Sequence, residues 1–271
     1  MPEKIQPADV AFFQAFGYLA LPGALAGDYG WISDEFEQVW RDRPDIRHDG
    51  SQRTMFPALF IAQRPRLTAL LEHPAVVAIA DALLGEGWSL YGGDGNFYSG
   101  DTGWHSDCGP AQWQPKTTLR HLKIAFYLDP LTADTGALRV IPGSHHFGDR
   151  YADLLENGAL SGRPGQSIPA QALPITPGDL IAFDHRLKHA AFGGAQRRRM
   201  FTINLLAPIR DAAQREAALT IFRHYRDIDG CTWDFGAAWL ASLTPGQARR
   251  LAPAVDLGRE VMAEARPVGS R

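Results

Sequence analysis

The chain has 271 residues, 45% of them hydrophobic and 21% charged, so it can bury a full core and is not a disordered protein. A net charge of −3 and a pI near 6.3 supply no basic field, which argues against nucleic acid or a membrane surface as a partner. Its two cysteines give no disulfide framework, and the amino terminus lacks the apolar core of a signal peptide. We therefore expect a single domain over residues 1–271, soluble and cytoplasmic, whose oligomeric state is open.

Helical patterns occur near the amino terminus. Residues 7–16 place aromatic and apolar side chains at helical spacings, and Gly17 follows as the stop. A second helix is expected over 74–84, because Pro74 suits the first helical position and Gly85 the position after the end.

The pattern changes between about residues 88 and 207, where short apolar or alternating runs are bounded by Gly, Pro and Asp. Three strands can be placed there, at 121–129, 178–185 and 200–206. Many short strands in one domain indicate a mainly β fold, such as a cupin-like jelly roll that closes two sheets around a site. Beyond residue 210 the helical pattern returns, and we expect this tail to pack outside the sheet.

The most informative motif is His105-Ser106-Asp107 with a distant His189. Residues i and i+2 of a strand point to the same face, so the first imidazole and the carboxylate can reach one ion. His189 follows a Gly-Asp turn and an apolar strand, as a ligand on a neighbouring strand would. Two imidazoles and one carboxylate are the facial triad of non-haem Fe(II) oxygenases. Zinc could use the same ligands, and purely structural histidines are the third interpretation.

Three consecutive arginines, Arg197, Arg198 and Arg199, follow the second histidine. One of them could hold the far carboxylate of an anionic cosubstrate through two parallel hydrogen bonds. Alternation along the next strand puts Arg198 on the polar face and Arg199 on the apolar face. We therefore favour Arg198, keep Arg199 as the second choice, and interpret Arg197 as part of a solvated turn.

Several blocks of the chain resemble the phytanoyl-CoA dioxygenase family of Fe(II)- and 2-oxoglutarate-dependent oxygenases. The blocks are WHSD (104–107), TGALRVIPGSH (135–145), PGDLIAFDHRLKHA (177–190) and RRRMFTINL (197–205), and FFQAFGYLALPGAL (12–25) is similar to that family's opening helix and strand. The resemblance covers roughly residues 8–207 and implies a double-stranded β-helix core at about 88–207, with helical flanks. It also implies Fe(II) as the metal, 2-oxoglutarate as the cosubstrate and O2 as the oxidant.

The family's roles, carried over by position, make His105, Asp107 and His189 the iron ligands. His185 competes for the third place, but it lies in a segment where the family has a strand. Arg198 or Arg199 would bind 2-oxoglutarate.

Further pocket residues are weaker candidates. Asn96 and Tyr98 precede the first motif and could donate hydrogen bonds to the cosubstrate. Lys123 and Tyr127 share the non-apolar face of their strand, which could be pocket or solvent; we count Lys123 with the cosubstrate and Tyr127 with the substrate. Trp113 could form a wall of the substrate site or be a surface tryptophan.

The resemblance implies hydroxylation of a small metabolite or natural-product intermediate, with release of succinate and CO2. Asp107 argues against halogenation, because related halogenases lack this carboxylate. The sequence CGPAQWQPKTT (108–118) departs from the signature of ectoine hydroxylases, which argues against ectoine as substrate. The Gly-rich and polar segment 146–172 is expected to be a lid that sets specificity.

Two other functions stay open. A zinc-dependent hydrolase or isomerase on a similar barrel would need a general base near the metal, and no further Glu stands out in the motif blocks. A non-catalytic barrel that binds a small ligand would form no succinate.

Overall fold

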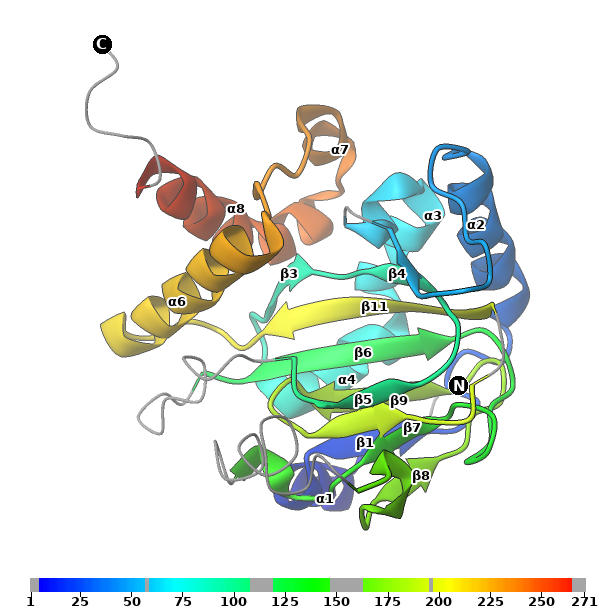
Figure 1. The fold of residues 1–271 in the computed structure, drawn as a ribbon. Coiled ribbons are helices and arrows are strands. Elements are labelled where there is room, and N and C mark those ends of the chain that lie inside the picture. Colours follow the sequence, from blue (N-terminus) through cyan, green and yellow to red (C-terminus); the bar gives the residue numbers. More distant parts are fainter. Residues whose placement is uncertain (1–4, 57–58, 108–118, 147–162, 195–196, 265–271) are drawn as a thin grey trace.

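The computed structural model describes residues 5–56, 59–107, 119–146, 163–194 and 197–264 (Figure 1). Strands within these ranges form two antiparallel sheets. The strands are β1 (Tyr18–Leu21), β2 (Thr54–Met55), β3 (Ser89–Gly92), β4 (Gly95–Tyr98), β5 (Thr102–His105), β6 (His121–Tyr127), β7 (Leu138–Val140), β8 (Gln171–Leu173), β9 (Leu180–Asp184), β10 (His189–Ala191) and β11 (Arg198–Leu206). The larger sheet has the order β1-β9-β6-β11-β4-β2, with β3 also paired to β11, and the smaller has the order β5-β10-β7-β8. The predicted jelly-roll core with flanking helices is confirmed.

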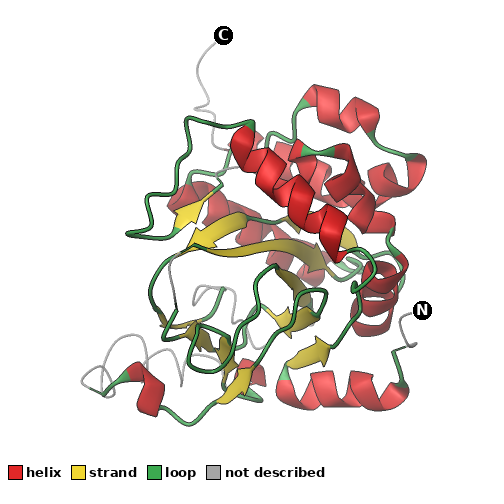
Figure 2. Ribbon diagram, turned by 90° about the vertical axis from the view of Figure 1, so that its right-hand side faces the viewer, coloured by secondary structure: helices red, strands yellow, loops and turns green. Residues whose placement is uncertain are grey.

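Most of the helices lie on one side of the strands (Figure 2). They are α1 (Pro7–Phe16), α2 (Tyr29–Arg41), α3 (Pro65–Thr68), α4 (Pro74–Leu84), α6 (Ala212–Asp229), α7 (Ala237–Ser242) and α8 (Pro245–Glu264). Both predicted N-terminal helices are confirmed, and Gly17 ends the first with φ of 82°, a left-handed conformation that suits glycine. Helix α2 was not anticipated from the sequence.

The helices cover the outer face of the larger sheet with a continuous apolar core. Strand β6 pairs along its whole length with β11, and Phe126 stacks on Phe201 at 4.4 Å between ring centroids. The alternating residues on this face are buried in that core: Leu122, Ile124, Phe126, Phe201, Ile203 and Leu205. Each such side chain contributes roughly 1.5–3 kcal/mol through burial. The alternation expected for these two strands is confirmed, and β11 begins two residues earlier than the predicted 200–206.

The other faces of the same strands point between the two sheets. There, Lys123 and Tyr127 of β6 and Met200 of β11 line a pocket. Lys123 and Tyr127 therefore face the pocket and not bulk solvent. Polar residues can occupy the space between the sheets because it is a pocket and not part of the main apolar core.

The C-terminal tail packs outside the larger sheet, as expected. Helix α8 contacts β3, and α6 packs against α8 (Figure 1). Phe222 of α6 is buried and stacks on Trp233 at 3.9 Å between ring centroids. Val261 of α8 is also fully buried, so the tail is part of the folded domain.

The expected lid over 146–172 is described only in part, because residues 147–162 lie outside the described ranges. Gln171 and Ala172 already belong to β8, the edge strand of the smaller sheet. Among the described residues, no single helix is long and apolar enough to cross a membrane; the consecutive segments Pro65–Glu72 and Pro74–Leu84 reach that length only together, across a 47° bend.

Candidate metal centre

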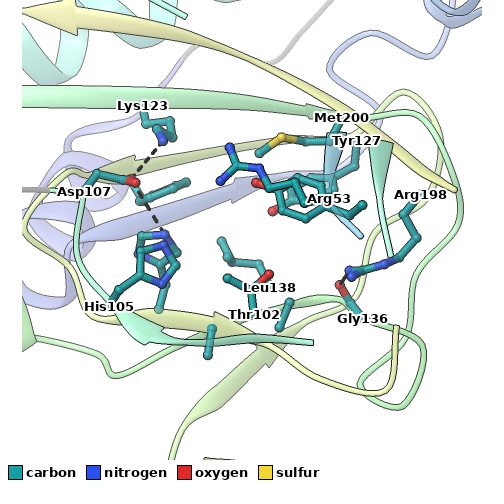
Figure 3. Close-up of a pocket in the computed structure, with 15 residues that line it drawn as sticks. Arg53, Thr102, His105, Asp107, Lys123, Tyr127, Gly136, Leu138, Arg198 and Met200 are labelled. Atoms are coloured by element: carbon teal, nitrogen blue, oxygen red, sulfur yellow. Dashed lines mark hydrogen bonds and ion pairs between the residues drawn. The ribbon is translucent and has the colours of Figure 1, made fainter. Parts of the chain in front are cut away.

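A pocket lies between the inner faces of the two sheets (Figure 3). Its empty space is about 560 Å³ when the open mouth is included. The larger sheet contributes side chains from β4, β6, β9 and β11, and the smaller sheet from β5, β7 and β10. The lining residues are Arg53, Tyr98, Thr102, His105, Asp107, Lys123, Tyr127, Gly136, Leu138, Phe183, His189, Ala190, Ala191, Arg198 and Met200.

The structure brings His105, Asp107 and His189 together at one end of this pocket. The two histidines are direct partners in the β5–β10 pairing, and their ring centroids are 4.2 Å apart. Asp107 follows two residues after His105, and its backbone N–H donates to the carbonyl of His185 at 3.0 Å. One ligand atom from each of the three side chains lies within 4.8 Å of the others. This spacing is suited to a shared metal ion.

Backbone carbonyls orient both imidazoles. Nδ1 of His105 donates to the carbonyl of Gly103 at 2.8 Å, and Nδ1 of His189 donates to that of Leu187 at 2.9 Å. Each Nε2 is therefore the nitrogen that remains for a metal, as in sites where a second contact fixes the ring. Burial lowers the pKa of His189 to about 3, so this imidazole is neutral, the form that binds metals.

Asp107 shares one carboxylate oxygen between two neighbours. Its Oδ2 lies 3.7 Å from Nε2 of His189 and 2.9 Å from Nζ of Lys123 (Figure 3). Burial alone would raise the pKa of Asp107, but the Lys123 ammonium and the nearby histidines hold it below its usual value. Burial would likewise lower the pKa of Lys123, but the carboxylates of Asp107 and Asp94 raise it. The site thus holds a carboxylate anion beside an ammonium cation.

Arg198 lines the opposite end of the pocket and is 7% exposed. Its Nη1 donates to the carbonyl of Gly136 at 2.9 Å and its Nη2 to that of Gly100, whereas Nε has no partner among the described residues. A Cβ atom at Gly136 or at Gly194 would overlap this guanidinium. Glycine at both positions therefore leaves the space that the arginine fills.

Arg199 points to the other side of the sheet, which corrects its place as second choice for cosubstrate binding. Its guanidinium donates to Asp129 at 2.7 Å and to Glu37 at 3.1 Å, and it does not line the pocket. Neighbouring residues on a strand face opposite sides, so only one of the two arginines can enter the pocket. Arg197 is a surface residue with φ of 59°, and it also pairs with Glu37.

Asn96 does not line the pocket either, contrary to the sequence-based expectation. It is fully buried, and its amide donates to Asp94 and accepts from Nε of Arg53 at 2.7 Å. Its hydrogen-bonding groups are thus used within the protein. The other strand candidates, Tyr98, Lys123 and Tyr127, do line the pocket, and burial raises the pKa of Tyr98 to about 12, so its phenol stays protonated.

Two further candidates are His185 and Trp113. The buried ring of His185 lies 3.3 Å from the hydroxyl of Tyr91 and is not in the cluster of possible metal ligands, which argues against its role as the third ligand. Burial lowers the pKa of His185 to about 3. Trp113 falls in residues 108–118, outside the described part of the chain.

Arg53 is a pocket residue that the sequence did not reveal. Its guanidinium lies 4.8 Å from the ring centroid of Tyr98 and 3.1 Å from the carboxylate of Asp94. It stands just before the two-residue strand β2, far along the chain from every motif, so no spacing pattern marks it. With Arg53, the described lining of the pocket has three cationic side chains, the others being Lys123 and Arg198.

Solved structures of other proteins share this architecture. No curated protein sequence matches the chain. Among solved structures, the carbocyclase SnoK from nogalamycin biosynthesis has a TM-score of 0.57 at 20% identity, over 76% of this chain and 85% of its own. EctD from S. alaskensis with bound Fe has 0.57 at 22%, over 75% and 77%. EvdO2 from Micromonospora carbonacea var. aurantiaca, complexed with 2-oxoglutarate, has 0.53 at 21%, over 79% and 95%. At these identities the three show a shared fold.

The family model described as phytanoyl-CoA dioxygenase (PhyH) matches residues 13–200, which include the His-Asp-His cluster and Arg198. The donor set fits Fe(II), because two imidazoles and one carboxylate on one side of a pocket form a facial triad. Together, the matched sequence, the two-sheet fold and the triad place this chain in the phytanoyl-CoA dioxygenase family of 2-oxoglutarate-dependent non-haem iron oxygenases.

Proposed function

We propose that this protein hydroxylates a small metabolite or natural-product intermediate, with conversion of 2-oxoglutarate to succinate and CO2. The observation that supports this most is the arrangement of one pocket, with the His-Asp-His cluster at one end and the guanidinium of Arg198 at the other (Figure 3). A dicarboxylate with one end at the metal and the other at an arginine fits such a pocket.

Three residues would hold the metal: His105 and His189 through Nε2, and Asp107 through a carboxylate oxygen. Fe(II) bound there supplies activation of O2, coupled to decarboxylation of the cosubstrate. Arg198 would bind the distal carboxylate of 2-oxoglutarate, since its Nε is unpartnered among the described residues and its other nitrogens are held in place by backbone carbonyls.

The walls of the pocket would orient the substrate and exclude water. Tyr127 and Leu138 line it from the two facing sheets, and Phe183 and Met200 add apolar surface. Asp107 keeps the carboxylate position filled, which favours oxygen chemistry over halide transfer. Related folds include a carbocyclase, so cyclisation or another oxidation is an alternative to hydroxylation for the same machinery.

The test is an anaerobic loading of the full chain with Fe(II) and 2-oxoglutarate, followed by O2 and measurement of succinate with and without a panel of candidate metabolites. Stimulated succinate that disappears in His105→Ala would support the proposal, and product mass would separate hydroxylation from cyclisation. Absence of succinate under every condition would refute it.

A zinc-dependent hydrolase remains the second candidate function. Among the described lining residues, Asp107 is the one carboxylate, and it belongs to the proposed ligand set. Such an enzyme would therefore need its general base from elsewhere. Metal analysis of the purified protein, with zinc retained and no succinate formed, would favour this candidate.

A further inference from the structure

The ammonium group of Lys123 lies next to the proposed metal position. Both are neighbours of the same carboxylate oxygen, Oδ2 of Asp107. Nζ of Lys123 is 2.9 Å from Oδ2 of Asp107, and Nε2 of His189 is 3.7 Å from that oxygen on the other side. A metal ion held by Asp107 and His189 would therefore have this ammonium as a close cationic neighbour. Proteins more often surround metal ligands with groups that strengthen their binding.

The fold gives the Lys123 side chain little freedom to move away from Asp107. It lies in the middle of β6, paired with Phe183 of β9 on one side and Asn204 of β11 on the other. Its side chain is only 11% exposed, and Nζ lies 5.9 Å from the ring centroid of Phe183. The other nearby carboxylate, Asp94, is already bonded to Thr202 and Arg53. Asp107 is thus the ion-pair partner that the structure gives this lysine.

A cation at this place has two opposite effects on ligands. It repels a divalent ion and competes with it for Oδ2, so it weakens metal binding to the otherwise empty pocket. It attracts an anion, and Arg53 and Arg198 line the same pocket and add to that attraction. When a dianion enters, its charge offsets the ammonium, and the penalty on the metal falls. Metal and dianion then favour each other's binding, and this coupling is reciprocal.

We propose that Lys123 is a positioning residue that makes metal binding depend on the anionic cosubstrate. Its ammonium holds Oδ2 of Asp107 in the metal-free protein and lowers the affinity for a divalent ion until a dicarboxylate occupies the pocket. This inference rests on the proposed function, since it takes the His-Asp-His cluster as the metal site and 2-oxoglutarate as the anion.

The test measures the dissociation constant of Mn(II) by electron paramagnetic resonance of the free ion, with and without N-oxalylglycine, a stable analogue of the cosubstrate. For the wild-type protein we expect N-oxalylglycine to tighten Mn(II) binding. Lys123→Met removes the charge and keeps the length of the side chain, so it should bind Mn(II) alone about tenfold more tightly than the wild type. The tightening caused by N-oxalylglycine should shrink by about the same factor in this variant.

Two further variants separate charge from structure. Lys123→Arg keeps the cation and should behave like the wild type, whereas Lys123→Gln keeps a hydrogen-bond donor without charge and should behave like Lys123→Met. If the methionine variant does not fold, the glutamine variant carries the comparison. A lysine that only orients the carboxylate would give weaker Mn(II) binding in both neutral variants, which would overturn the inference.

The wild-type protein alone also tests the idea, since Mn(II) binding that ignores N-oxalylglycine would overturn it. His105→Ala distinguishes this failure from a failure of the proposed function. If His105→Ala binds Mn(II) as well as the wild type does, the metal site itself is wrongly assigned. If it loses Mn(II) while the Lys123 variants match the wild type, the site stands and only the role of Lys123 is refuted.

Discussion

Arg198 and Gly136 fit together as a bonded pair: Nη1 of the arginine donates to the glycine carbonyl at 2.9 Å, and a Cβ on the glycine would overlap that nitrogen. A Cβ atom at Gly194 would come equally close to Nη2. The carbonyls of Gly136 and Gly100 hold the guanidinium, and Gly136 and Gly194 leave space for it. The far end of the pocket thus depends on residues that carry no side chain.

A methyl group at Gly194 should displace Arg198 and weaken cosubstrate binding. We expect Gly194→Ala to raise the KM for 2-oxoglutarate at least about tenfold, because a small misplacement of an orienting group is costly. Steady-state succinate assays measure this. Gly136→Ala should do the same and also lower the melting temperature, since its φ of 94° disfavours alanine. Gly30→Ala on α2, where a Cβ has open space, is the matched control. An unchanged KM in Gly194→Ala would contradict the proposed place of the distal carboxylate.

Replacement of the two neighbouring arginines should give opposite results. Arg198→Met should raise the KM for 2-oxoglutarate about a hundredfold, because a charge-assisted contact of about 1.5–3 kcal/mol is lost. Arg199→Met should leave that KM near the wild-type value. It should instead lower the free energy of unfolding by about 1–3 kcal/mol, because the partly buried carboxylate of Asp129 loses its ion-pair partner and that of Glu37 loses one of two. Kinetics and urea denaturation on both variants measure the two effects, and a similar KM for both would refute the assignment.

Arg53 should strengthen anion binding from the mouth of the pocket. Its side chain is 44% exposed, so solvent screens its charge and the effect should be moderate. We expect Arg53→Met to weaken N-oxalylglycine binding about three- to tenfold, with less difference at high salt. Calorimetric titration of the Mn(II)-loaded protein gives the affinity. Arg66→Met, which removes an exposed cation outside the pocket, should have no effect; equal losses in both would mean that only the overall charge matters.

Buried neutral histidines should make the metal-free protein sensitive to acid. Burial lowers the pKa of His121 to about 4 and that of His185 to about 3, both below the ordinary value of 6.5. Between pH 6.5 and about 4 the unfolded chain therefore binds more protons, so the free energy of unfolding falls as the pH falls. Each histidine contributes up to about 1.4 kcal/mol per pH unit in this window.

His121→Leu should remove one of these contributions. Urea denaturation between about pH 7 and pH 5 should show a smaller loss of stability with acid in this variant than in the wild type, by up to about 1.4 kcal/mol per pH unit. Parallel curves for the two proteins would show that His121 takes up no proton on unfolding.

The sequence predicted those parts of the site that depend on local spacing. The two-residue spacing of His105 and Asp107 was predicted to bring both side chains to one ion, and the structure brings them together although β5 ends at His105. Period-two alternation also places Arg198 and Arg199 on opposite faces of β11. Strand β6 and most of β11 were also predictable, because their apolar side chains alternate with more polar ones over five or more residues. Strand β5, which carries His105, was not among the predicted strands.

Other parts depend on contacts that no local pattern records. Arg53 reaches the pocket from an irregular segment, and only the β2–β4 pairing brings that segment to the site. Asn96 was predicted to face the cosubstrate, but the neighbouring Asp94 and Arg53 take up its amide. The ion pair between Lys123 and Asp107 joins β6 to the segment after β5, strands that belong to different sheets.

The folded part of the chain extends beyond the residues that the family model matches, because it includes the C-terminal helices. The match ends at residue 200, yet Phe222 and Val261 are fully buried and the hydroxyl of Tyr225 reaches the carbonyl of Asp107 at 3.4 Å. A chain shortened to the matched span would lose residues 201–206 of the central strand β11 and would expose side chains that now pack on α8. In a cell, chaperones would bind such a fragment and proteases would degrade it before it could act on a substrate. Loss of activity in such a fragment would therefore reflect its instability and removal in the cell, and would say nothing about the chemistry of the pocket.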